Sequence, residues 1–128
     1  MRIPPQQSRP KHLALHLIKL PLPGIVSILH RVSGVVLFFV LPILLYLLQA
    51  SLQSPESYTQ LNQVFAHPLV KLMLLGFSWA FLHHFCAGLR YLAIDLHAVR
   101  NLADARSSSK IVMGVSLLLT VIVGAKLW

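Results

Sequence analysis

The chain has 128 residues, of which 56% are hydrophobic and only 11% are charged. Soluble domains carry about 25% charged residues, and a single domain of this length has too little interior to bury so much apolar surface. The composition therefore excludes an ordinary soluble fold and predicts a protein of the lipid bilayer. The net charge of +8 comes from cations that flank apolar segments, which indicates membrane topology and argues against nucleic-acid binding.

Three apolar segments, at about residues 23–52, 67–95 and 111–128, are predicted to cross the membrane as helices. A helix needs roughly 20 apolar residues to span a bilayer, and the third segment only just reaches that length. Pro42 lies in the middle of the first segment, where it is expected to kink the helix. The sequence therefore predicts an all-α membrane protein of three transmembrane helices, which form a single membrane-anchor domain over residues 1–128.

The distribution of basic residues predicts the orientation of these helices. Four Lys or Arg residues lie in the N-terminal segment 1–22 and three in the predicted loop 96–110, whereas the predicted loop 53–64 has none. Because cytoplasmic segments carry the excess of Lys and Arg, residues 1–22 and 96–110 are expected on the cytoplasmic side of a bacterial inner membrane. The loop 53–64 and the C-terminus are then expected on the periplasmic side.

Four ionisable side chains lie in the cytoplasmic half of the predicted helices, namely His30, Arg31, His84 and Arg90. A charged side chain at the centre of a membrane helix costs about 2.5–3.5 kcal/mol on insertion scales. Residues of this kind are therefore candidates for function. Their depths, counted from the predicted helix ends, allow all four to lie around one cavity.

His84 is the candidate ligand of a haem iron. A neutral imidazole is a standard axial ligand, and Ala87 and Gly88, one turn further on, leave room beside it for a flat macrocycle. Arg90, roughly 9 Å along the helix, suits pairing with a haem propionate. Two alternatives stay open: the neighbouring His83 is the ligand, or the histidine only forms a hydrogen bond to another helix.

Ser27 and Arg31 are one turn apart on the same face of the first predicted helix. A hydroxyl and a guanidinium near the cytoplasmic surface suit hydrogen bonding to a quinone carbonyl. In the alternative interpretation, Arg31 extends to a lipid phosphate while Ser27 bonds to its own helix. The two residues taken alone favour this alternative.

Two motifs carry a resemblance to a known family. The first reads SILHRVSG over residues 27–34 and follows an Arg9–Pro10 pair. The second has the spacing H-x3-G-x-R-x4-D, which is met by His84, Gly88, Arg90 and Asp95. With its length and three spans, the chain resembles the cytochrome b556 subunit of succinate dehydrogenase throughout. It departs from that family at Tyr91, where many members have histidine, which weakens a propionate contact there but leaves the ligand unaffected.

The resemblance implies a membrane anchor of respiratory complex II, which works with a flavoprotein, an iron–sulfur subunit and a second small anchor. It implies that haem b lies between the two anchors with one histidine from each, which maps the iron ligand of this chain onto His84. It also implies that Ser27 and Arg31 contact ubiquinone and that His30 and Arg31 lie near the haem propionates. The chain alone is expected to hold no complete active site, because it lacks a dinucleotide fingerprint and a cysteine cluster.

Two other functions are consistent with the same residues. An anchor of a quinol:fumarate reductase would serve the reverse reaction, and the sequence barely separates the two directions. A haem-free structural anchor or small transporter would use the histidines as polar contacts between helices. A reduced haem b absorption band distinguishes the haem-binding functions from the haem-free one.

Overall fold

The computed structural model describes residues 19–128, and all regular secondary structure in that range is helical. The chain forms, in order, helices α1 (Leu22–Ser51), α2 (Pro55–Ala66), α3 (Pro68–Asp95) and α4 (Leu102–Leu127). Helices α1, α3 and α4 are long and apolar enough to cross a membrane, which confirms the predicted all-α membrane protein with three transmembrane helices. Of the predicted N-terminal segment 1–22, residues 1–18, with the Arg9–Pro10 pair, lie outside the described residues.

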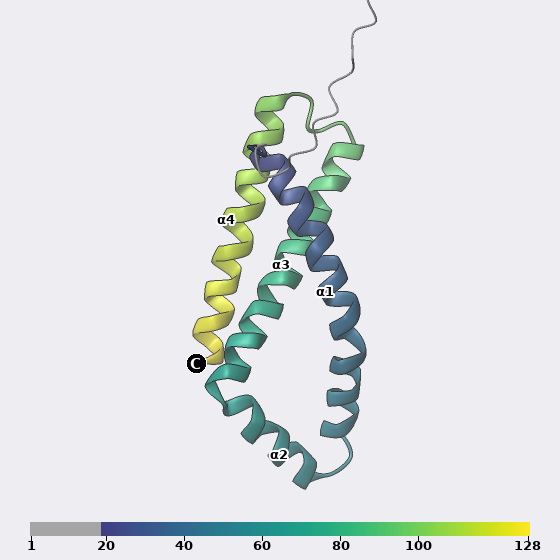
Figure 1. The fold of residues 1–128 in the computed structure, drawn as a ribbon, viewed down its shortest axis with the longest axis vertical. Coiled ribbons are helices and arrows are strands. Elements are labelled where there is room, and N and C mark those ends of the chain that lie inside the picture. Colours follow the sequence, from purple (N-terminus) through teal and green to yellow (C-terminus); the bar gives the residue numbers. More distant parts are fainter. Residues whose placement is uncertain (1–18) are drawn as a thin grey trace, which may run out of the picture.

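The three long helices come together at one end of the molecule, where α1 begins, α3 ends and α4 begins (Figure 1). At the opposite end, α2 connects α1 to α3 obliquely, and the C-terminus lies near the start of α3. There the Lys71 ammonium lies 5.2 Å from the centre of the Trp128 ring. Trp and Lys are both typical of the membrane–water interface, so this pair is consistent with an interfacial position for Trp128.

The first two transmembrane helices begin and end within one residue of their predicted bounds. Pro42 lies inside α1 and does not end it. Helix α3 begins after His67, whose Nδ1 accepts a hydrogen bond from the Leu69 amide at 3.3 Å. Just beyond the end of α3, His97 adopts a left-handed backbone conformation with φ of 58°, a conformation that commonly follows a helix end.

The predicted start of the third transmembrane helix is wrong, because α4 begins at Leu102 and not near residue 111. Asn101 caps the helix by accepting a hydrogen bond from the Asp104 amide at 2.8 Å, and Asp104 accepts one from the Arg100 amide at 3.2 Å. The first bond satisfies a free amide in the first turn of the helix, and the second fixes the residue just before the cap against that turn. The polar residues that were expected in a loop therefore form the first turns of a helix that projects beyond its apolar part.

The expectation of a polar loop over residues 53–64 is also wrong, because most of it forms α2. Ser54 caps this helix by accepting a hydrogen bond from the Ser57 amide at 3.1 Å. Pro55 occupies the first turn, where its missing N–H costs nothing, and Glu56 in the same turn complements the helix dipole. The sequence Ser-Pro-Glu is thus a helix start that a reading based on hydropathy alone overlooks.

The interior of the bundle is small and partly polar. Val26 of α1, Ala87 of α3 and Val112 of α4 form its apolar centre. The buried hydroxyls of α4 bond to carbonyls of their own helix, at distances of 2.7 to 3.1 Å; these are Ser109, Ser116 and Thr120. Most large apolar side chains instead face outward, as expected where lipid or a neighbouring membrane helix is the surrounding medium.

Candidate functional site

Helices α1 and α3 together form a groove that contains three of the four ionisable residues predicted to be functional, namely His30, Arg31 and His84. It has a volume of about 450 Å³ and is lined by His30, Arg31, Gly34, Val35, Phe38, Phe39 and His84. Phe38 and Phe39 are 73% and 66% exposed, so the groove is open on the outer side of α1. A flat apolar molecule that enters this groove meets a histidine from each helix and one guanidinium.

The hydrogen bonds of His84 fix which of its ring nitrogens is free. Nδ1 of His84 lies 3.0 Å from the backbone carbonyl oxygen of His30 and 3.3 Å from Oγ of Ser33. Since a carbonyl oxygen can only accept, Nδ1 carries the proton and donates it. In the neutral ring, Nε2 is then the nitrogen with a free lone pair. A metal-binding histidine in proteins has this arrangement, with its other N–H donated to a backbone carbonyl.

Gly34 and Ser33 position this imidazole, and neither was singled out from the sequence. A Cβ atom at Gly34 would lie 3.3 Å from Nδ1 of the His84 ring and 2.9 Å from Cε1, and the second distance is closer than real Cβ atoms approach. The Ser33 hydroxyl donates to the His30 carbonyl at 2.9 Å. It also lies 3.3 Å from Nδ1 of His84, so Ser33 contacts both the donor and the acceptor of the hydrogen bond between His84 and His30. Both residues lie in the SILHRVSG motif, which is the signal that identifies them.

The His30 side chain packs directly on the His84 ring. The two rings are stacked, with centroids 4.2 Å apart and an angle of 11° between their planes. The Tyr91 ring lies on the same side of α3, 5.1 Å from the His30 ring. Tyr91 therefore contacts the groove-lining His30, from the position where the resemblance leads one to expect histidine.

Arg31 lines the groove, and Ser27 continues its row along α1. Ser27, Arg31, Gly34 and Phe38 are spaced by four, three and four residues, the repeat of one helix face. The last three line the groove, so the half-buried Ser27 lies on the same face, one turn nearer the helix start. Arg31 therefore lines the groove, whereas Ser27 shares its helix face but is not among the residues that line the groove.

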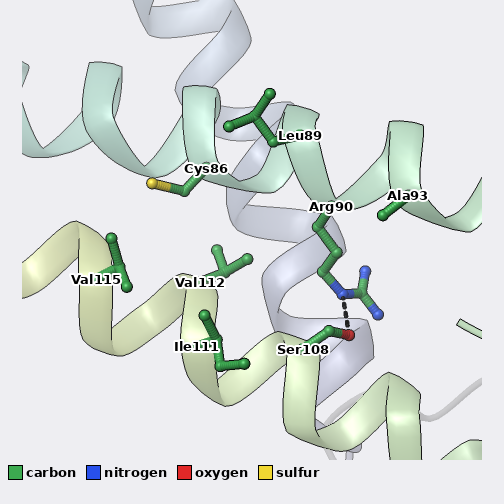
Figure 2. A pocket seen from close by; sticks show the side chains of 8 residues that line it. All are labelled: Cys86, Leu89, Arg90, Ala93, Ser108, Ile111, Val112 and Val115. Atoms are coloured by element: carbon green, nitrogen blue, oxygen red, sulfur yellow. Dashed lines mark hydrogen bonds between the residues drawn. The ribbon is translucent and has the colours of Figure 1, made fainter. Parts of the chain in front are cut away.

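Arg90 does not join this groove. It lies six residues after His84, about 240° round the helix axis, and its side chain turns toward α4 (Figure 2). Nε of Arg90 donates to Oγ of Ser108 at 3.0 Å, and Nη2 donates to the carbonyl of Ala105 at 3.4 Å. The assignment of Arg90 to a haem propionate stays a prediction, which these contacts do not support.

His83 lies inside the bundle and not in the groove. Its side chain is fully buried, and its ring centre is 5.3 Å from the ring of Trp79 on the same helix. Neither ring nitrogen of His83 has a hydrogen-bond partner within residues 19–128. Of the two adjacent histidines, His84 is therefore the one that a molecule in the groove can reach.

Comparison with known proteins gives one family for almost the whole chain. The sequence model of the family described as succinate dehydrogenase/fumarate reductase transmembrane subunit matches residues 5–123. All the residues that line the groove, from α1 and at His84, lie within this matched range.

Individual relatives agree with the family. The succinate dehydrogenase cytochrome b556 subunit of Coxiella burnetii is 37% identical over 121 residues, which cover 94% of this chain and 97% of the relative. The protein of the same description from Rickettsia typhi is 33% identical over 89% of each chain. That of Paracoccus denitrificans is 30% identical over 90% of this chain and 88% of the relative. The similarity therefore extends over the full set of helices.

Proposed function

Because the chain belongs to the succinate dehydrogenase/fumarate reductase transmembrane subunit family, as a membrane anchor subunit of succinate dehydrogenase, we propose that its groove binds haem b through His84 and a quinone through Ser27 and Arg31. The relatives are named cytochrome b556 subunits, and that name implies haem b. His84 would hold the haem iron from this chain, and a second anchor subunit would supply the other protein ligand. Electrons from succinate then reach ubiquinone in the membrane.

The observation that carries this proposal is the hydrogen bond from Nδ1 of His84 to the His30 carbonyl. It holds the imidazole in the tautomer whose Nε2 is free to bind iron. The Gly34 backbone, without a side chain, leaves the space that the ring occupies. The donor set thus fits haem b, which when bound supplies a one-electron redox centre within the membrane. His30 and Arg31, on the same groove, are the proposed neighbours of the propionates.

For the quinone, the proposed roles follow from the chemistry of the two side chains. The Ser27 hydroxyl donates a hydrogen bond to a quinone oxygen. The Arg31 guanidinium stabilises the negative charge that develops on that oxygen during reduction, an effect that is strong where water is excluded. The site lies roughly 8 to 14 Å from the start of α1, which suits electrons arriving from a soluble iron–sulfur partner.

The proposed partners are a flavoprotein, an iron–sulfur subunit and a second small anchor. The open groove supports the second anchor in particular, because the exposed Phe38 and Phe39 leave its outer side uncovered. Residues 1–128 act as one membrane-anchor domain that contributes no complete active site. The start of α1 and the connection between α3 and α4 face the cytoplasm, since the basic residues gather there.

The test is to purify the chain from native membranes with its partners, and to record subunit masses and a reduced-minus-oxidised spectrum. The proposal expects three co-purifying subunits, two of them soluble when detached, and a haem b band. If the same subunits co-purify as a fully assembled complex that shows no haem band, the haem-free structural anchor is the function.

A further inference from the structure

A second hollow lies between α3 and α4 (Figure 2). Its α3 residues lie about 140° to 240° round the helix axis from His84, so the hollow is on the opposite flank of α3. Its volume is about 320 Å³. Apart from one hydroxyl and one guanidinium its walls are apolar, and they consist of Cys86, Leu89, Arg90, Ala93, Ser108, Ile111, Val112 and Val115. The walls come from two transmembrane helices, so the hollow is a surface of the bundle within the membrane.

Arg90 brings an uncompensated positive charge to this hollow. The residue is only 7% exposed, and a guanidinium stays protonated in proteins. Its hydrogen bonds go to neutral oxygens of Ser108 and Ala105, and the Tyr91 ring 5.8 Å away offers only a cation–π contact. No carboxylate in residues 19–128 pairs with it, and residues 1–18 contain no Asp or Glu. Burial of a charge without a counter-ion is costly, so this site favours an anionic ligand.

The position of the charge indicates how such a ligand is oriented. Arg90 lies five residues before the end of α3, roughly 8 Å along its axis, so it is close to the membrane surface. From Ser108 to Val115 the hollow extends along α4 by roughly 10 Å toward the middle of the helices. A molecule that fits has an anionic group at the surface and an apolar chain that follows the helices inward.

The surroundings of the hollow are basic as well. Between residues 90 and 110 the chain has two acidic residues, Asp95 and Asp104. Against these stand four cations, which are Arg90, Arg100, Arg106 and Lys110. Basic segments next to a membrane helix attract anionic lipid headgroups, so the net charge adds to the preference set by Arg90.

We infer that the hollow between α3 and α4 binds one anionic phospholipid, with its phosphate on the Arg90 guanidinium and an acyl chain along Ala93, Val112 and Val115. The headgroup phosphate supplies the missing counter-charge through charge-assisted hydrogen bonds. The acyl chain covers apolar wall residues of both helices and so joins α3 to α4. This inference does not depend on the haem and quinone assignments, because the two hollows lie on different flanks of α3.

The experiment uses the complex purified with its partner subunits and stripped of lipid by detergent exchange. Phosphatidylglycerol, and separately phosphatidylcholine, is titrated in, and bound lipid per complex is counted by native mass spectrometry. Arg90→Gln is expected to weaken phosphatidylglycerol binding about tenfold or more, as for the loss of a charge-assisted bond. Lys126→Gln, at an exposed position in the last turn of α4 and so far from the hollow, is the control and should leave binding within about twofold.

A second variant protects the test against misfolding. Ala93→Leu fills the hollow while Arg90 stays in place, and it should also weaken phosphatidylglycerol binding, without loss of any subunit. Equal binding of both lipids by the unmodified complex, or unchanged binding in both variants, would overturn the inference. So would loss of a partner subunit from Ala93→Leu, which would mean that protein occupies the hollow. A changed haem spectrum in Arg90→Gln with unchanged lipid binding would assign the guanidinium to the cofactor instead.

Discussion

The backbone carbonyl of His30 lies 3.0 Å from Nδ1 of His84, so α1 orients the imidazole that α3 presents. The two residues are 54 positions apart in the sequence, and the crossing of the two helices brings them together. The proposed iron ligand therefore depends on residues of α1 as well as on His84 itself. The first two predictions test this dependence.

Gly34→Ala should disturb haem binding although Gly34 is not a ligand. The new Cβ would lie 2.9 Å from Cε1 of His84, so the ring must move and its bond to the His30 carbonyl weakens. Alanine is about 1 kcal/mol better than glycine inside a helix, so a weaker α1 cannot explain the effect. We expect a shifted or smaller haem b band per assembled complex. Gly24→Ala, whose Cβ would have its nearest neighbour at 3.8 Å, should leave the band unchanged; equal spectra for both variants would contradict the account.

Ser33→Ala should lower the midpoint potential of the haem. Without the Ser33 hydroxyl, one donor fewer shares the His30 carbonyl, so the bond from Nδ1 of His84 strengthens and makes the imidazole a stronger donor to iron, which favours the oxidised state. A neutral hydrogen bond contributes about 1 kcal/mol, which corresponds to roughly 40 mV for one electron. Redox titration of the haem band measures this shift in midpoint potential. Ser51→Ala is the control, because Ser51 makes the same type of bond, at 2.7 Å to Leu48, at the far end of α1; a shift of equal size there would rule out a specific role for Ser33.

Hydropathy was sufficient to predict the three transmembrane helices, because each apolar run is long and bounded by polar residues. It was insufficient for the polar helices. The start of α4 and the whole of α2 depend on caps at Asn101 and Ser54, and a cap is a local hydrogen bond that leaves average hydropathy unchanged. Polar segments in this chain are therefore better interpreted from cap residues than from composition.

The sequence predicted that His30, Arg31 and His84 lie around one cavity, because rise per residue converts position into distance along a helix, and these three residues do line one groove. For Arg90, the sequence prediction did not take into account the direction of the side chain around the axis of α3. Six residues correspond to about 240° of rotation, which turns its side chain to α4 and Ser108. The roles of Ser33 and Gly34 could not be predicted, because they depend on where α1 and α3 cross. A local sequence pattern does not specify that crossing.

Ser27→Ala and Arg31→Leu should lower succinate:quinone activity by about tenfold or more, since removal of one donor to developing charge costs a few kcal/mol. Succinate oxidation with an artificial acceptor that takes electrons from the soluble subunits should stay unchanged. Both assays are run on the same membranes and normalised to assembled complex. Parallel loss of both activities would mean that the residues serve assembly. Unchanged quinone activity would mean that quinone binds elsewhere.

The orientation is testable with single cysteines, after Cys86 is replaced by alanine. Gln53→Cys lies between α1 and α2, and Arg106→Cys lies on the projecting turns of α4; both positions are exposed. In the proposed orientation, with the basic end in the cytoplasm, a membrane-impermeant maleimide added to intact cells should label position 53 and not position 106. Labelling should reverse in inside-out vesicles. The opposite pattern would invert the topology and place the groove near the periplasm.

The most direct test of the proposed haem site compares the two adjacent histidines. His84 lines the groove with a free Nε2, whereas His83 is fully buried within the bundle. The measurement is the reduced-minus-oxidised spectrum of the purified complex, normalised to assembled complex, for His84→Ala and for His83→Ala. The account predicts that His84→Ala loses or shifts the low-spin haem b band and that His83→Ala largely keeps it. A band lost in His83→Ala and intact in His84→Ala would contradict it.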